Sequence, residues 1–219
     1  MILFTEEQRI NINKLNPLTD SKFTYDVNRW ANLNQNFKYL IQDFENIEIS
    51  RKNVIDAFDA YFKNEDNSFI KPFLLSMVWG FSNTGYGTHR TNNYISVEEN
   101  RTKIKNALDF INDDQNDSLK KAYKELKKIK GLGISYITKV LYFATRAKKQ
   151  ETYSLIFDIR VAAALLKLTT PKEIYEIVNV GPSSKFSDYE KYNILLRNIA
   201  NTNDIEPEQL EMYLFNQDF

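Results

Sequence analysis

Apolar residues recur along much of this chain at the spacing of an amphipathic α-helix. Between residues 68 and 79 they form one face that stops at Gly80. The same spacing predicts helices at about 53–63, 186–200 and 206–215. No run of alternating apolar and polar residues predicts a large sheet, and only Phe23-Thr24-Tyr25 favours a short extended piece. The pattern therefore predicts a mainly α architecture.

Two short sequences have the composition of a helix start. In Ser96-Val97-Glu98-Glu99, the Ser96 hydroxyl and the Glu99 carboxylate can each accept from a backbone amide that the helix leaves unpaired, which makes a capping box. Thr170-Pro171-Lys172-Glu173 has the same pattern, with Pro171 at the first helical position. We predict a helix N-terminus at each of them.

Two helical faces with the same spacing flank the sequence Gly131-Leu132-Gly133. The apolar residues before it are Leu119, Ala122, Leu126 and Ile129, and those after it are Ile134, Ile137, Leu141 and Ala144. Two helices joined by so short a turn form a hairpin. Because glycine has no side chain, another molecule can approach closely, and amides at the start of the second helix can bind a phosphate. The predicted backbone-binding residues are Gly131, Gly133, Ser135 and Lys130.

Basic residues gather in the same stretch, although the whole chain of 219 residues has no net charge. Residues 119–149 contain ten Lys or Arg against Glu125 alone, so the rest of the chain must carry a charge of about −9. Such a basic stripe suits a phosphate-binding face. A solvated, lysine-rich helix surface has the same composition.

The composition excludes several kinds of site. There is no cysteine, which rules out disulfides, thiolate catalysis, cysteine-held zinc and iron–sulfur clusters, and the single His89 rules out a multi-histidine metal site. No stretch approaches the roughly 18 apolar residues that span a bilayer. The apolar stretch Met1–Phe4 is too short for a signal peptide, and the residues that follow it are too acidic. We expect a cytoplasmic protein without a metal, cofactor, membrane or disulfide-linked partner.

The segment from Gly80 to Thr91 is the one loop that looks suited to a ligand. It holds three of the six glycines, Gly80, Gly85 and Gly87, beside aromatic residues, Arg90 and His89. Glycines permit tight turns and the close approach of a ligand. An ordinary connection between two helices has the same composition.

Asp158 follows the apolar sequence Leu155-Ile156-Phe157 and precedes a third helical face, made by Val161, Leu165 and Leu168. A carboxylate in this place would be held against an apolar wall at a helix start. Its alternative role is that of an N-cap, a common device worth about 1 kcal/mol.

A hairpin, a turn and then an aspartate resemble the helix-hairpin-helix DNA glycosylases that have a Gly/Pro-rich loop and an aspartate. Within them the chain looks closest to bacterial proteins of the 8-oxoguanine DNA glycosylase fold. The resemblance runs from about Ser68 to the C-terminus and rests on Trp79-Gly80-Phe81, the 85–91 segment, Gly131-Leu132-Gly133, 138–143, 157–160 and 211–215. It implies a two-lobed helical fold over residues 1–219, with 66–219 as the glycosylase-like core. Residues 1–65 give no firm match.

The chain departs from the family's pattern at the nucleophile. In the 8-oxoguanine branch the hairpin reads Gly-x-Gly-x-Lys and that lysine attacks the sugar, whereas here the matching position is Ser135. Lys139 lies four residues further on, which on a helix is the same face one turn along. Lys130 replaces the proline usual before the hairpin glycine, and the stretch from Gly133 to Asp158 is a few residues longer than in the family.

The resemblance implies a protein that binds double-stranded DNA in the nucleoid, flips a damaged or modified nucleotide into a pocket and cleaves its N-glycosidic bond. Lys139 would attack the anomeric carbon and form a Schiff base, which permits β-elimination, and Asp158 would stabilise the positively charged sugar. For Lys139 the ordinary alternative is a lysine that snorkels from a helix flank. Candidate contacts to the base or to DNA are Trp79, Tyr86, His89, Arg90, Tyr142 and Phe143, although most of the aromatic rings are equally suited to a core.

Three functions stay open. The first is a DNA glycosylase with or without β-lyase activity. The second is a catalytically inactive DNA-binding module of the same fold, which the serine at position 135 favours. The third is an enzyme of this fold that acts on a modified base in a setting such as bacterial defence.

Overall fold

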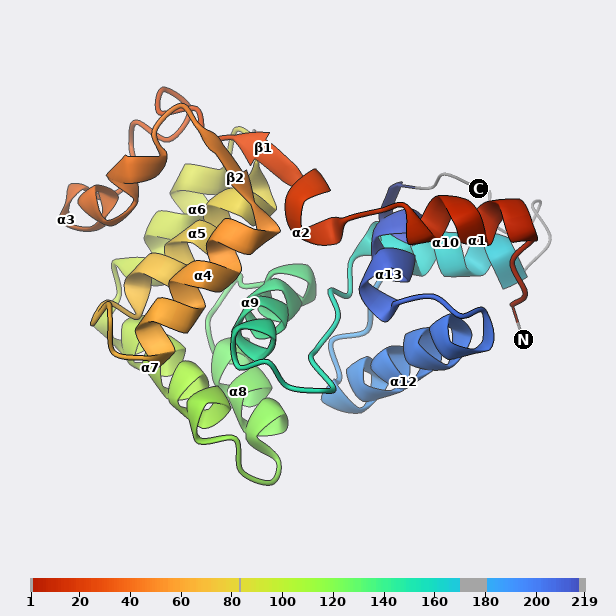
Figure 1. Cartoon of the computed structure of the whole chain (residues 1–219). Helices are drawn as coiled ribbons and strands as arrows, with labels where there is room; N and C mark the ends of the chain where they lie inside the picture. The colour runs from red at the N-terminus through yellow and green to blue at the C-terminus, as the bar shows by residue number, and fades with distance from the viewer. Residues whose placement is uncertain (1, 83, 170–180, 217–219) are drawn as a thin grey trace. The chain divides into compact units, whose positions relative to one another are not determined.

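The polypeptide divides into two units, one formed by a single continuous segment and the other by two segments distant in sequence. The computed structural model describes residues 2–82, 84–169 and 181–216 (Figure 1). The central unit is one continuous segment, Ser21–Ser154. The terminal unit combines residues 1–20 with residues 155–219, so it contains both ends of the chain.

The central unit is helical apart from a two-stranded sheet. Its elements are β1 (Lys22–Thr24), α3 (Gln35–Lys38), the 3-10 helix η1 (Tyr39–Phe44), β2 (Glu48–Ser50), α4 (Arg51–Phe62), α5 (Ile70–Phe81), α6 (Gly87–Ile95), α7 (Glu98–Asp113), α8 (Ser118–Lys127) and α9 (Ile134–Ala147). Strands β1 and β2 pair antiparallel, with Phe23 opposite Ile49. Helix α4 begins directly after β2, because Ser50 and Asn53 form a capping box there.

Helices α4, α5 and α9 pack on one another and form the core of the central unit. Helix α5 is apolar on nearly every side, and most of its residues are buried because it also contacts α6 and η1. Helix α9 buries all of residues 137–145. Helix α8 packs on both α7 and α9 (Figure 1).

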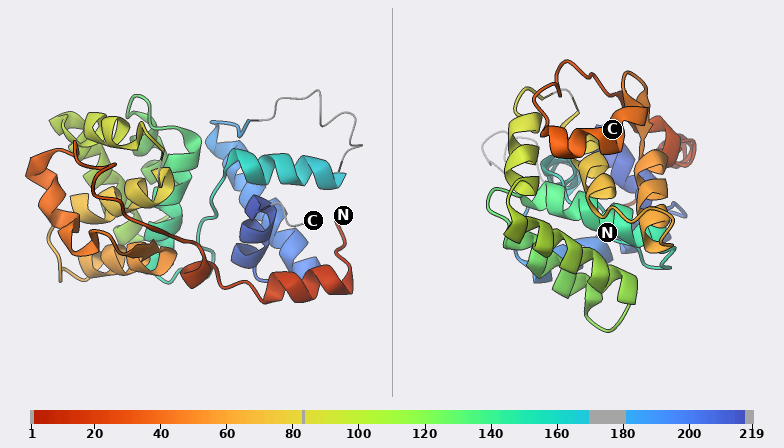
Figure 2. Two further views of the ribbon diagram at one scale, coloured as in Figure 1. Left: turned by 90° about the horizontal axis from the view of Figure 1, so that it is seen from above. Right: turned by 90° about the vertical axis from the view of Figure 1, so that its left-hand side faces the viewer.

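The terminal unit is built around the last helix of the chain. Its elements are α1 (Glu6–Asn13), α2 (Pro17–Asp20), α10 (Ile159–Thr169), α12 (Phe186–Thr202) and α13 (Pro207–Asn216). Helix α13 packs on α10 and α12 and also on α1 and α2 (Figure 2). Asn203 ties the N-terminal segment to the end of α12, because its Oδ1 accepts from the Phe4 amide at 2.8 Å and its Nδ2 donates to the Ile2 carbonyl at 3.0 Å.

The described residues confirm a mainly α fold and most of the predicted helices. Helices α4, α5, α8, α9, α10, α12 and α13 cover the segments where apolar residues follow helical spacing. Strand β1 begins one residue before the Phe23-Thr24-Tyr25 sequence. The turn between α8 and α9 is the predicted Gly-x-Gly connection.

The predicted capping box at Ser96 is wrong. Helix α7 begins at Glu98 with Val97 as its N-cap and without a side-chain cap. Ser96 is instead the C-cap of α6, and its Oγ accepts from Asn34 Nδ2 at 3.0 Å. Glu99 is engaged by Lys103 at 2.7 Å. The second predicted box, Thr170–Glu173, lies outside the described residues.

The predicted loop from Gly80 to Thr91 is also largely wrong. Helix α5 continues through Gly80 to Phe81, and α6 begins at Gly87. Glycine usually weakens a helix interior, but packing on neighbouring helices overrides that propensity here. Of the described residues from Gly80 to Thr91, Ser82 and residues 84–86 lie outside the two helices.

Candidate functional site

Buried side chains hold the turn between α8 and α9 in place, while its two glycines are exposed. Gly131 has φ +85°, a left-handed conformation that glycine adopts without strain. Between the two glycines the Leu132 side chain is buried, and the Tyr94 hydroxyl donates to the Gly131 carbonyl at 2.8 Å. Burial raises the pKa of Tyr94 while Arg90 opposes that rise, so the hydroxyl keeps its proton and remains a donor.

Gly133 is the N-cap of α9 and has no side chain with which to cap it. The first amides of a helix have no partner within the helix, so a turn of this kind offers donors to an anion. Lys130, Gly131 and Gly133 are all exposed. The predicted backbone-binding residues thus lie together at one end of α9.

Lys139 is buried in α9, with 5% of its surface exposed. Its Nζ donates to the Ser135 hydroxyl at 2.7 Å and lies 5.3 Å from the centre of the Tyr136 ring. The prediction that residues 135 and 139 share one helix face is therefore confirmed. Since Ser135 is the second residue of α9, the amine lies at the first turn of the helix, beside the Gly131–Gly133 turn.

Asp158 directly precedes α10 in the terminal unit. Its backbone carbonyl accepts from the Ala162 amide at 3.0 Å, and its Oδ1 accepts from the Arg160 amide at 3.2 Å. This is the geometry of an N-cap, so the structural role of Asp158 is established.

The three residues before Asp158 are fixed by helix α12. Tyr189 and Tyr192 donate their hydroxyls to the carbonyls of Leu155 and Ile156, each at 2.7 Å. The Leu155 amide donates to Asn193 Oδ1 at 2.8 Å. The Phe157 ring stacks on Tyr192 with 4.3 Å between ring centres. We call Tyr189, Tyr192 and Asn193 the α12 clamp, because they hold the backbone that carries Asp158.

Three of the predicted base contacts belong to the aromatic core of the central unit. Tyr142 and Phe143 are fully buried, and Phe143 packs against Trp79 with ring centres 5.2 Å apart. The Trp79 indole donates to the Ser21 carbonyl, and Arg51 lies over the Trp79 and Tyr142 rings. We therefore assign Tyr142 and Phe143 to packing rather than to a base pocket, whereas Trp79 packs on Phe143 and stays partly exposed.

The other three predicted contacts lie on the surface near the start of α6. Tyr86 is 54% exposed, the Arg90 guanidinium lies 4.7 Å from its ring centre, and His89 is exposed beside them. The Tyr86 ring meets Phe81 edge-on, and Phe81 stacks on Tyr136 with 4.1 Å between ring centres. A continuous series of rings thus leads from the exposed Tyr86 to the surroundings of Lys139.

The lysines of α8 form an exposed face that continues to the turn. Ala122, Tyr123 and Leu126 are the buried side of this helix. The lysine face consists of Lys120, Lys124, Lys127 and Lys130, which are all exposed and recur at helical spacing. Glu125, the acidic residue of α8, is paired with Lys128 outside this set.

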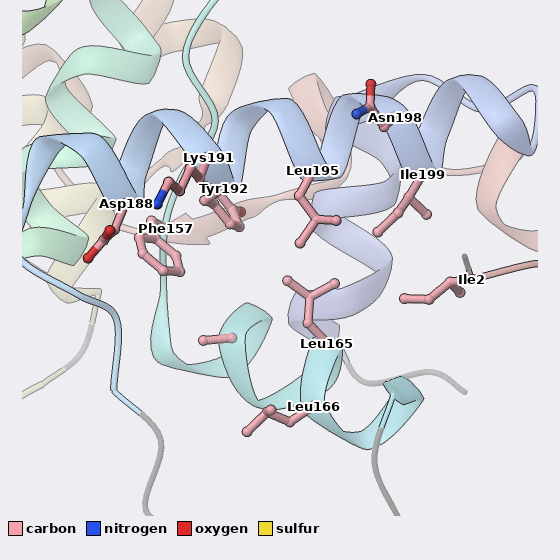
Figure 3. Close-up of a pocket in the computed structure, with 11 residues that line it drawn as sticks. Ile2, Phe157, Leu165, Leu166, Asp188, Lys191, Tyr192, Leu195, Asn198 and Ile199 are labelled. Carbon is pink, nitrogen blue, oxygen red and sulfur yellow. The ribbon is translucent and has the colours of Figure 1, made fainter.

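The terminal unit also contains a mostly apolar cavity of about 780 Å³ between α10 and α12 (Figure 3). Leu165 and Leu195 point toward each other across it, Phe157 forms part of its wall, and Asp188 and Lys191 bring charge to it. None of the predicted base contacts lines this cavity. Among the residues that the structure describes, no group of His, Asp and Glu side chains could hold a metal ion, and no helix is long and apolar enough to cross a membrane.

Comparison with known proteins places the chain among the DNA glycosylase-like proteins. It belongs to the family described as "Putative 8-oxoguanine DNA glycosylase OGG-like protein", whose model matches residues 16–215. The match covers residues 16–65, which are most of the N-terminal segment in which the sequence shows no motif of the family. No curated protein and no solved structure matches the chain.

Proposed function

We propose that this protein is a DNA glycosylase that removes a modified base from double-stranded DNA, with Lys139 as its nucleophile. The observation that carries the proposal is the buried Lys139 amine, which lies at the first turn of α9 beside an exposed Gly-x-Gly turn. A nucleophile next to a phosphate-binding helix end can reach a sugar whose phosphate that helix end holds. Family membership supports the same reaction class.

In the proposed reaction the neutral Lys139 amine attacks the anomeric carbon of the sugar. The N-glycosidic bond breaks, and the base leaves with its electron pair and takes up a proton. The attached nitrogen loses a proton, the ring oxygen takes one up as the sugar ring opens, and a Schiff base results. That species allows β-elimination, in which C2′ loses a proton, a C2′=C3′ double bond forms and the C3′–O bond to the 3′ phosphate breaks. Asp158 stabilises the positive charge that develops on the sugar.

The DNA grip has two proposed components. Gly131, Gly133 and the amides that follow them bind a phosphate, and Lys130 with the rest of the lysine face supplies charge. Tyr86, His89 and Arg90 are proposed DNA contacts because they are exposed and adjoin the ring series that ends at Lys139.

The proposed function is tested by borohydride trapping. Wild-type protein is incubated with a duplex containing an abasic site and sodium borohydride, which reduces a Schiff base to a stable covalent adduct. We expect an adduct with the wild type and none with Lys139→Gln. Lys52→Gln provides a matched control, because Lys52 is an exposed lysine of α4 paired with Asp56. A parallel duplex with 8-oxoguanine tests base release.

The two alternative functions have distinct outcomes in this experiment. Duplex binding without an adduct and without base release from either duplex would identify a DNA-binding module and overturn the proposal. An adduct with the abasic duplex but no release of 8-oxoguanine would retain the Lys139 chemistry and point to another modified base, as expected for a defence-associated enzyme.

A further inference from the structure

We propose that Gly80 and Ser135 are positioning residues that fix the place of the Lys139 amine. Gly80 provides room for the stem of the lysine, and Ser135 retains its amine at the first turn of α9. This inference rests on the proposed function, because it concerns how the proposed nucleophile is held.

The space for the lysine stem exists because residue 80 has no side chain. A Cβ at this position would lie 3.0 Å from Lys139 Cδ and 3.2 Å from Tyr136 Cε1. Such contacts are tighter than ordinary van der Waals contact, so both side chains would have to shift by a few tenths of an ångström. Glycine within a helix costs about 0.5–1 kcal/mol relative to alanine. The contact with Lys139 gives a physical reason for a glycine at this place in α5.

The neighbouring residue of α5 fixes the other wall. Phe81 is buried and stacks on the Tyr136 ring at 4.1 Å, with an angle of 25° between the ring planes. The Lys139 Nζ in turn lies 5.3 Å from the Tyr136 ring centre, within range of a cation–π interaction. Helix α5 thus contributes two features to this site. Gly80 leaves space for the Lys139 side chain, and Phe81 packs against the Tyr136 ring beside the amine.

The Ser135 hydroxyl is a hydrogen-bond partner of the Lys139 amine. It accepts from Lys139 Nζ at 2.7 Å, across one turn of α9. This hydrogen bond holds the amine at the helix end that follows the Gly131–Gly133 turn.

The test compares trapping rate, DNA affinity and thermal stability in one set of variants. These are Gly80→Ala, Ser135→Ala, Ser135→Thr and the glycine control Gly181→Ala, where an added Cβ meets no atom within 4 Å. We expect Gly80→Ala to slow borohydride trapping about tenfold, because a small displacement of a reacting group reduces the rate steeply. Its Kd for the abasic duplex should stay within about twofold of wild type, and its Tm should not fall, since alanine favours the helix.

Ser135→Ala should slow trapping by about tenfold, because the amine is no longer held at the first turn of α9 and the rate falls steeply when a reacting group is displaced. Ser135→Thr, which keeps the hydroxyl, should recover most of that rate. Gly181→Ala should match the wild type in all three measurements. Recovery by threonine separates the hydroxyl's role in placing the amine from a general effect on packing.

Failure of this inference is distinguishable from failure of the proposed function. If Lys139→Gln forms the adduct as the wild type does, the assignment of the nucleophile is wrong. If Lys139→Gln forms none while Gly80→Ala and Ser135→Ala form it at the wild-type rate, only the positioning inference is overturned. It is equally overturned if slower trapping in Gly80→Ala is accompanied by a matching rise in Kd or fall in Tm.

Discussion

Lys139 and Asp158 are the two proposed catalytic residues, and the protein positions them by different means. Lys139 lies within a helix, and its amine is held through its side chain by Ser135, four residues away in sequence. Asp158 lies directly before a helix, and the backbone of Leu155 and Ile156 ahead of it is held by hydroxyl and amide groups of α12, more than 30 residues away. The first arrangement is local and fixes an atom at the end of a flexible stem. The second is long-range and fixes the chain itself.

This difference determines which changes each residue should tolerate. The Lys139 side chain is flexible, so the position of its amine depends on the side chains packed around it. Small steric changes nearby should therefore move the amine. The Asp158 side chain is short, so the position of its carboxylate is set by the backbone. Its function should therefore be sensitive to replacement of the carboxylate and to loss of the α12 clamp. The following predictions test that contrast.

The largest effect is expected from Asp158→Asn. Asparagine is as good an N-cap as aspartate, so the free energy of unfolding should change by less than about 0.5 kcal/mol. The negative charge is lost, so the rate of base excision should fall about 10²- to 10³-fold. Single-turnover excision and denaturant unfolding measure the two effects.

Asp158→Ala serves as the comparison, because it should add about 1 kcal/mol of destabilisation to the same loss of rate. If the asparagine variant excised the base at the wild-type rate, Asp158 would be a cap alone.

An intermediate effect is expected from Tyr192→Phe. The ring and its stack on Phe157 remain, but the buried Ile156 carbonyl loses its 2.7 Å donor. The free energy of unfolding should fall by about 1–1.5 kcal/mol, and excision should slow several-fold because the backbone before Asp158 is less fixed. Urea unfolding and single-turnover excision are the measurements.

Tyr39→Phe is the matched control, since Tyr39 is largely exposed. Equal losses of stability in both variants would show that the Tyr192 hydroxyl has no special part in the clamp.

The smallest effect is expected from the lysine face, which belongs to the unit that contains Lys139. Neutralising Lys124 and Lys127 together as Lys→Gln should lower the slope of log Kd against log salt by about 2, since each phosphate contact contributes about 0.9. The trapping rate at saturating DNA should not change. Fluorescence anisotropy between about 50 and 200 mM salt covers the useful range.

Lys52 and Lys63, both paired with aspartates on α4, form the control pair for this measurement. An unchanged slope in the Lys124 and Lys127 variant would assign the lysine face to solvent.

The parts of the fold that sequence predicted are those set by local interactions. Helical spacing of apolar residues located α4, α8, α9, α12 and α13, because burying one face requires that spacing whatever the partner is. The Ser96 capping box failed because the Ser96 hydroxyl is used by Asn34, a residue 62 positions away. The extent of α5 was misjudged because helix propensity at Gly80 is outweighed by contacts with α9.

In the candidate site too, the features set by local spacing could be predicted from sequence, and those set by distant partners could not. The shared face of Ser135 and Lys139 follows from a four-residue spacing, and the cap role of Asp158 follows from its place before an apolar helix. Gly80, Tyr94 and the α12 clamp were missed because their partners are distant in sequence, and a tyrosine or glycine in a helix has no local pattern that reveals such a partner. Trp79, Tyr142 and Phe143 could not be separated from Tyr86 by composition, because only packing decides which ring is covered.

The arrangement of the terminal unit has a consequence for synthesis on the ribosome. Helix α1 packs on α13, and Phe4 is tied to Asn203, so α1 and Phe4 can reach these partners only after about 200 further residues have been synthesised. The central unit, by contrast, has all its residues once position 154 has emerged. At roughly 5–20 residues per second, the remaining stretch takes on the order of several seconds. During that interval the central unit can be complete while residues 2–13 still lack α13 and Asn203, so the apolar side chains of Phe4 and Ile12 stay uncovered until the rest of the terminal unit has emerged.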